Sequence, residues 1–158
     1  MLQGPRRPRT LTLIMLITQS EIDDAVATLA PVMRRTPLVA SRVLSERSGS
    51  DVWLKCENLQ RTGSFKPRGA FYRISRLSSA ERAAGVVAAS AGNHAQGVAW
   101  SAAHLGITSR VYMPVGAALP KLAATKAYGA EVVLTGETID QSLVAAREFA
   151  ENTGATLI

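Results

Sequence analysis

Apolar residues recur along the chain in short runs, separated by longer amphipathic stretches. The stretches between the runs show apolar positions at helical spacing, whereas the runs have the length and β-branched content of strands. The strand-like runs are residues 52–56, 85–90, 110–114, 131–134 and 155–158. Strands that alternate with helices are typical of βαβ units, so the pattern predicts an α/β fold.

The strand-like runs are continuously apolar rather than alternating, as in GVVAAS and EVVL. Continuous runs indicate burial on both faces, which predicts an open, mostly parallel sheet with helices on both faces. In that architecture ligands gather outside the carboxyl ends of the strands. Two junctions expected there are unusual: TGSFKPRG after the first run and SAGNHAQG after the second. We expect these two loops to follow adjacent strands.

Two helices are expected before the first strand-like run. Residues 20–35 begin with Ser20, a residue type favoured at the N-cap, and carry acidic residues in the first turn. This helix leads into TPLVAS. Residues 41–49 predict a second, short helix that ends at Gly49.

The opening residues combine basic side chains with an apolar run at residues 11–17. This resembles the first two regions of a signal peptide, but no small-x-small cleavage site follows, and a membrane span needs about 20 apolar residues. We interpret residues 1–16 as a disordered arm, or as the product of a start site assigned upstream of Met15. Residues 17–158 are expected to be the folded part.

Composition narrows the function classes. The 158 residues are 47% hydrophobic and 19% charged, as in ordinary globular proteins, and three arginines within residues 6–9 supply half of the net charge of +6. With only 5% aromatic residues there is no stacking platform for nucleic acid. The single cysteine, Cys56, suits a reducing cytoplasm, and the distant His94 and His104 give no metal-ligand spacing.

The first junction places a lysine at an expected helix start. Ser64 can cap the helix, Pro67 is tolerated in its first turn, and Lys66 lies between them. The positive end of the helix dipole, with partial burial beside Phe65, disfavours the ammonium, and a neutral amine can act as nucleophile or base. The simpler alternative is a solvated surface lysine.

The second junction has the residue types of an anion site. Gly92 permits close backbone approach, and exposed amides at a helix start bind anions. Asn93 can donate a hydrogen bond to an oxygen, while Ser90 with the local amides can hold a carboxylate. Neither a GxGxxG motif nor a Walker loop occurs in the chain. The simpler alternative is a strand-to-helix turn with a capping asparagine.

Together KCENLQRTGSFKPRGA and SAGNHAQGVA resemble the pyridoxal-phosphate enzymes of the tryptophan-synthase-β type, and most closely the threonine dehydratases (threonine ammonia-lyases). MPVGAALPKLAATKAYGAEVVL is similar to the same family, so the resemblance runs from about Ile17 to the end. It implies pyridoxal 5′-phosphate as cofactor. Lys66 would form the Schiff base, Phe65 would pack near the cofactor ring, and Asn93 would hydrogen-bond the phenolic oxygen.

The resemblance also implies a substrate loop and a reaction. The loop would grip the substrate carboxylate with Ser90, Ala91, Gly92, Asn93 and His94. Serine racemases of the same fold carry at the place of Ala91 a serine that acts as a second acid/base, so alanine favours elimination without racemisation. The implied reactions are L-threonine to 2-oxobutanoate and L-serine to pyruvate, each with ammonia. The alternatives are a serine racemase or serine dehydratase, or a catalytically inactive fragment.

Members of the resembled family are longer than this chain. Their glycine-rich phosphate loop and the residue facing the pyridine nitrogen lie beyond the matching part, and no GGG-type loop occurs here. We therefore expect residues 17–158 to be the N-terminal portion of a catalytic region. The resemblance further implies a cytoplasmic homo-oligomer when full length, with no nucleic-acid or membrane partner. It leaves open whether the enzyme serves isoleucine biosynthesis or threonine breakdown.

Overall fold

A four-stranded parallel sheet forms the centre of the structure, a computed structural model that describes residues 17–158. Its strands are β3 (Val86–Ala89), β4 (Ser109–Met113), β5 (Glu131–Leu134) and β6 (Thr156–Leu157), in the order β5-β4-β3-β6. The helices are α1 (Gln19–Leu29), α2 (Arg42–Ser48), α3 (Lys66–Ser75), α4 (Ser79–Ala84), α5 (Asn93–His104), α6 (Leu119–Ala127) and α7 (Ile139–Thr153). The interpretation of residues 1–16 as an arm or an upstream start lies outside the described residues.

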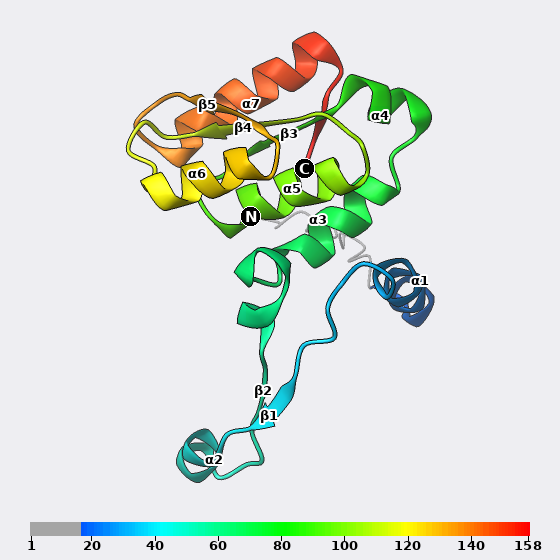
Figure 1. Cartoon of the computed structure of the whole chain (residues 1–158), viewed down its shortest axis with the longest axis vertical. Coiled ribbons are helices and arrows are strands. Elements are labelled where there is room, and N and C mark those ends of the chain that lie inside the picture. Colours follow the sequence, from blue (N-terminus) through cyan, green and yellow to red (C-terminus); the bar gives the residue numbers. More distant parts are fainter. Residues whose placement is uncertain (1–16) are drawn as a thin grey trace, which may run out of the picture.

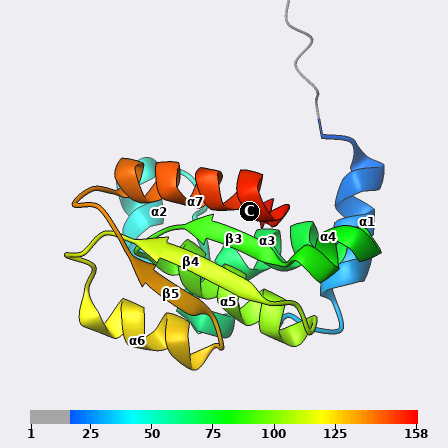
Figure 2. The same cartoon turned by 90° about the horizontal axis from the view of Figure 1, so that it is seen from above.

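Helices cover both faces of this sheet. Figure 2 shows α7 on one face and α5 with α6 on the other. Within β3, Val86 and Ala88 pack toward α5, whereas Val87 packs toward α7, as the period of two in a strand requires. All three side chains are buried, so the run reads as continuously apolar. The predicted open parallel α/β sheet with helices on both faces is confirmed.

The prediction for residues 52–56 is wrong in one respect. They contain a strand, β2 (Trp53–Lys55), but it pairs antiparallel with β1 (Leu38–Ala40) in a separate two-stranded ribbon. Figure 1 shows this ribbon extending from the main body, with α2 at its far end. Trp53 is 58% exposed, while Val87 in the main sheet is fully buried. Because both segments are short apolar runs, their sequences alone do not distinguish a ribbon from a core strand.

The first helix begins earlier and ends earlier than predicted. Its N-cap is Thr18 rather than Ser20: the Thr18 hydroxyl accepts a hydrogen bond from the Glu21 amide, and the Glu21 carboxylate accepts one from the Thr18 amide. This reciprocal pair is a capping box, and the spacing of Thr18 and Glu21 in TQSE is its signature. The helix ends at Leu29, shortly before Pro31.

Polar contacts tie the N-terminal segments to the rest of the structure. The Gln60 carboxamide accepts hydrogen bonds from the amides of Arg34 and Arg61, and donates to the Arg34 carbonyl at 2.8 Å. The Tyr72 hydroxyl of α3 donates to Asp24 of α1 at 2.6 Å. These contacts fix how the chain enters α3, where the first candidate site residues lie.

A half-buried ion pair joins the entry of α3 to the segment after β2. Arg68 donates to both carboxylate oxygens of Glu57, at 2.7 and 2.9 Å, and Thr36 donates to the same carboxylate. The hydrogen bonds from Arg68 lower the pKa of Glu57 below its ordinary value of 4.5, with a smaller contribution from Thr36 and against the effect of burial. A lowered pKa in the folded state means that folding favours the ionised carboxylate.

We therefore expect the contribution of Glu57 to stability to be complete above its unfolded-state pKa and to be lost as the pH falls through the lowered pKa. In urea unfolding between about pH 6 and pH 3, Glu57→Gln should show a shallower loss of unfolding free energy on acidification than the parent. Glu46→Gln is the matched control, because Glu46 forms only an exposed pair with Arg42. Parallel pH profiles for Glu57→Gln and the parent would contradict the assignment.

Candidate active site

The two unusual junctions lie together, but not in the way that the sequence predicts. TGSFKPRG does not follow a strand of the main sheet; instead α3 packs along α5, as Figure 1 shows. A Cβ placed on Gly97 of α5 would lie 3.1 Å from the carbonyl carbon of Lys66 and 3.2 Å from the Pro67 nitrogen. The absence of a side chain at Gly97 thus lets the start of α3 rest on α5, one turn after Asn93.

Lys66 is the first residue of α3, as expected, and is half-buried. Its Nζ lies 5.2 Å from the centroid of the Phe65 ring, within the range of a cation–π contact. Phe65 itself is 59% exposed and is the N-cap residue. The amine is therefore held beside an aromatic face at the positive end of a helix.

Ser64 does not cap α3, contrary to the prediction. It has extended backbone dihedrals and precedes the N-cap residue by one position, so its hydroxyl is not placed to accept from the first turn. The Ser64 Oγ is buried and has no hydrogen-bond partner among the described residues. A buried hydroxyl without a partner is costly, and Ser64 lies two residues before Lys66 in the chain.

The second junction forms the start of α5. Gly92 is the N-cap residue, and no side chain caps this helix, so the capping alternative for Asn93 does not hold. The Asn93 Oδ1 instead accepts a hydrogen bond from the Lys121 Nζ at 2.8 Å. The Ser90 hydroxyl accepts from the Gly92 amide at 3.2 Å, and the His94 Nε2 lies 3.0 Å from the Ile158 carbonyl oxygen.

Helix capping differs between the site and the rest of the fold. Among the α-helices of residues 17–158, a side chain caps the N-terminus of α1, α2, α4 and α7. No side chain caps α3, α5 or α6. The starts of these three helices adjoin one another through the Gly97 packing and the bond between Lys121 and Asn93. Uncapped amides at a helix start favour anions, so this region suits an anionic ligand.

A cavity of about 400 Å³ lies beside Lys66. It brings together three predicted site residues, Phe65, Lys66 and His94, whereas Ser90, Ala91, Gly92 and Asn93 are not part of its wall. Its remaining lining residues are Arg68, Gly69, Ala70, Arg73 and Ile158. Arg73 was not predicted, although its position seven residues after Lys66 puts both on one face of a helix. The basic wall and the uncapped helix starts of α3 and α5 fit a cofactor that carries an aldehyde and a phosphate.

Within residues 17–158, no three or more His, Cys, Asp or Glu side chains are grouped so that they could hold a metal ion. No helix in the same range has the length and apolarity needed to cross a membrane.

An open parallel α/β sheet with a lysine and uncapped helix starts beside a cavity is an arrangement in which α/β enzymes bind anionic ligands and cofactors. The sequence model of one such family, described as pyridoxal-phosphate dependent enzyme, matches residues 29–158. The chain therefore belongs to the pyridoxal-phosphate dependent enzyme family, as the resemblance predicted.

Individual relatives are similar in both sequence and fold. The chain is 50% identical over 143 residues to L-threonine ammonia-lyase of Thermotoga maritima. The matched stretch covers 90% of this chain and 36% of that protein. A maize serine racemase matches with a TM-score of 0.80 and 35% identity, over 87% of this chain and 42% of its own. Threonine deaminase isoform 2 of Solanum lycopersicum matches with a TM-score of 0.78 and 36% identity, over 89% and 40%. The chain thus spans about two fifths of the length of these relatives.

The Gly97 contact predicts a contrast between two Gly→Ala substitutions. Gly97→Ala should lower the unfolding free energy by about 1–3 kcal/mol, because the added methyl group meets the backbone of Lys66 and Pro67. Gly69→Ala, also inside a helix but with nothing within 4 Å of the added carbon, should be neutral or stabilising by up to about 1 kcal/mol. Urea unfolding measures both. Equal effects of the two substitutions would show that α3 does not rest on Gly97.

Proposed function

We propose that this protein is a pyridoxal-phosphate-dependent ammonia-lyase that converts L-threonine to 2-oxobutanoate and ammonia, and L-serine to pyruvate and ammonia. The observation that carries the proposal is the half-buried amine of Lys66 in a cavity shared with His94, in a chain of this family. The 50% identity to an L-threonine ammonia-lyase supports the substrate. In each reaction the water lost from the β-carbon is regained on release of ammonia, so the atoms balance without an oxidant.

Lys66 is proposed as the cofactor-holding and catalytic residue. Its amine would attach the cofactor covalently, with Phe65 against the cofactor ring and Asn93 donating to the phenolic oxygen. The bound cofactor would supply an electron-withdrawing group that makes the α-hydrogen of the amino acid acidic. The Lys66 Nζ would also serve as the general base that takes this α-proton. Its position at the start of α3, on the wall of the cavity, supports this role.

The loop of residues 90–94 is proposed to bind the substrate carboxylate. The start of α5 has no side-chain cap, so its amides are free to donate to an anion. Ser90 and Gly92 already share a hydrogen bond that shapes the loop, and His94 lines the cavity beside Lys66. Asn93 would then donate a hydrogen bond to the cofactor and also form part of the loop that binds the substrate carboxylate.

Serine racemisation is the second candidate, since a maize serine racemase shares the fold. Ala91 weighs against it, because a methyl group cannot return a proton to the face of the α-carbon opposite Lys66. The chirality of recovered serine separates the two activities.

We further propose that the reaction belongs to amino-acid metabolism, in isoleucine biosynthesis or threonine breakdown, and that the whole protein is a cytoplasmic homo-oligomer without nucleic-acid or membrane partners.

Covalent trapping tests the role of Lys66. The purified chain, mixed with pyridoxal phosphate and reduced with borohydride, should carry the cofactor on Lys66, as peptide mapping would show. Lys66→Ala should lose this label, whereas Lys126→Ala, which removes an exposed lysine of α6, should keep it. The amine of Lys66 should react in preference to the exposed ones because it lies on the wall of the cavity proposed to hold the cofactor. Label spread evenly over the surface lysines, or retained in Lys66→Ala, would contradict the proposal.

A further inference from the structure

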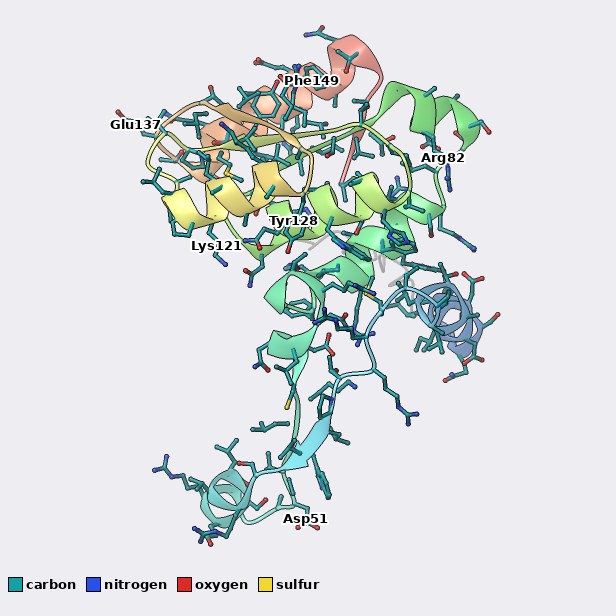
Figure 3. All side chains as sticks on the ribbon, in the orientation of Figure 1. Asp51, Arg82, Lys121, Tyr128, Glu137 and Phe149 are labelled. Atoms are coloured by element: carbon teal, nitrogen blue, oxygen red, sulfur yellow. The ribbon has the colours of Figure 1, made fainter. Side chains whose placement is uncertain are left out.

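Lys121 contacts Asn93, one of the residues proposed to bind the cofactor. It lies in the first turn of α6, is half-buried, and donates from Nζ to the Asn93 Oδ1 at 2.8 Å. Figure 3 shows Lys121 at the side of α6 that faces the start of α5. Within residues 17–158, none of the ion pairs involves Lys121. Within the described part of the chain, its hydrogen-bond acceptor is thus the neutral side-chain amide of Asn93, which is proposed to contact the cofactor.

The position of Lys121 is set by packing rather than by the side chain itself. Leu122, the next residue, packs against the buried cluster that contains Ala95 of α5. Four residues after Lys121, the buried Thr125 donates from its hydroxyl to the Lys121 carbonyl at 2.8 Å. The contact of Leu122 holds the first turns of α6 against α5, and the bond from Thr125 lies within α6. The packing of α6 on α5 therefore brings the Lys121 side chain within reach of Asn93.

The bond to Lys121 determines which end of the Asn93 amide is available. The side chain of asparagine has a broad, roughly two-fold final torsion, so an unrestrained amide can present either oxygen or nitrogen to a ligand. An ammonium has three donors and no acceptor, so it can bind only Oδ1. With Oδ1 engaged, the amide presents its Nδ2 hydrogens elsewhere. Only that orientation can donate to a phenolic oxygen.

We propose that Lys121 is a positioning residue that orients the Asn93 carboxamide as a hydrogen-bond donor to the cofactor. The inference rests on the proposed function, because it needs Asn93 to contact the phenolic oxygen. Loss of Lys121 would let the amide rotate and place Oδ1 toward an oxygen that carries negative charge. If Lys121 only held α5 and α6 together, as a tether, its loss would lower the free energy of unfolding without changing which end of the Asn93 amide faces the cofactor.

A double-mutant cycle tests the proposal on the full chain. We would measure the pyridoxal phosphate dissociation constant and the ratio of the cofactor absorption bands for the parent, Lys121→Met, Asn93→Ala and the double variant. Lys121→Met keeps the apolar stem and should weaken binding about tenfold, since hydrogen bonds to charged groups are among the stronger ones. Lys121→Arg should restore most of the affinity. Lys126→Met is the control on the same helix and should bind like the parent.

The cycle separates the inference from the proposed function. If Lys121 acts through Asn93, Lys121→Met should change affinity less than about twofold in the Asn93→Ala background. Additive effects in the double variant, or parent-like affinity and band ratio in Lys121→Met, would overturn the role of Lys121 alone. Parent-like affinity in Asn93→Ala would overturn the proposed role of Asn93 and the inference with it. A lowered unfolding midpoint in Lys121→Met with unchanged affinity would indicate a tether and overturn the proposal.

Discussion

The close contact between α3 and α5 at Gly97 is the constraint on which the candidate site depends. The strands of the main sheet lie on one side of α5, and α3 lies against another. A larger residue at position 97 would push away the backbone of Lys66 and Pro67. Because Asn93 lies one turn before Gly97 on the same helix, this contact sets the spacing between the proposed cofactor lysine and the proposed substrate loop.

The helix ends show a second constraint, in which stability and binding compete. Side-chain caps contribute to helix stability, and α1, α4 and α7 each have a complete capping box. The starts of α3, α5 and α6 lack such caps, and a buried hydroxyl at Ser64 lacks a partner nearby. The amides at the starts of these three helices can donate to a ligand that carries negative charge. The site thus uses helix-start amides that have no side-chain cap, whereas the other α-helices of residues 17–158 cap theirs with their own side chains.

The sequence allowed much of the fold and part of the site to be predicted. Continuous apolar runs identified β3 and β4, because strands buried on both faces have no polar side, and the partly exposed β5 and β6 carry runs of the same kind. Lys66 and Asn93 were placed at helix starts by their neighbours Pro67 and Gly92. The partner of β2 was not predictable, because pairing depends on which strand lies nearby rather than on the run itself. Lys121 was missed for a similar reason: it lies 28 residues from Asn93, and only the packing of α6 on α5 brings them together.

The central claim is that the two junctions form one site. Titration of the ¹⁵N-labelled chain with pyridoxal phosphate, followed by two-dimensional NMR of the backbone amides, tests it most directly. We expect the amides of residues 64–66 and 90–94 to shift together, with a single dissociation constant. Shifts confined to one junction, or two junctions that saturate at different concentrations, would contradict the claim that the packing of α3 on α5 creates a shared site.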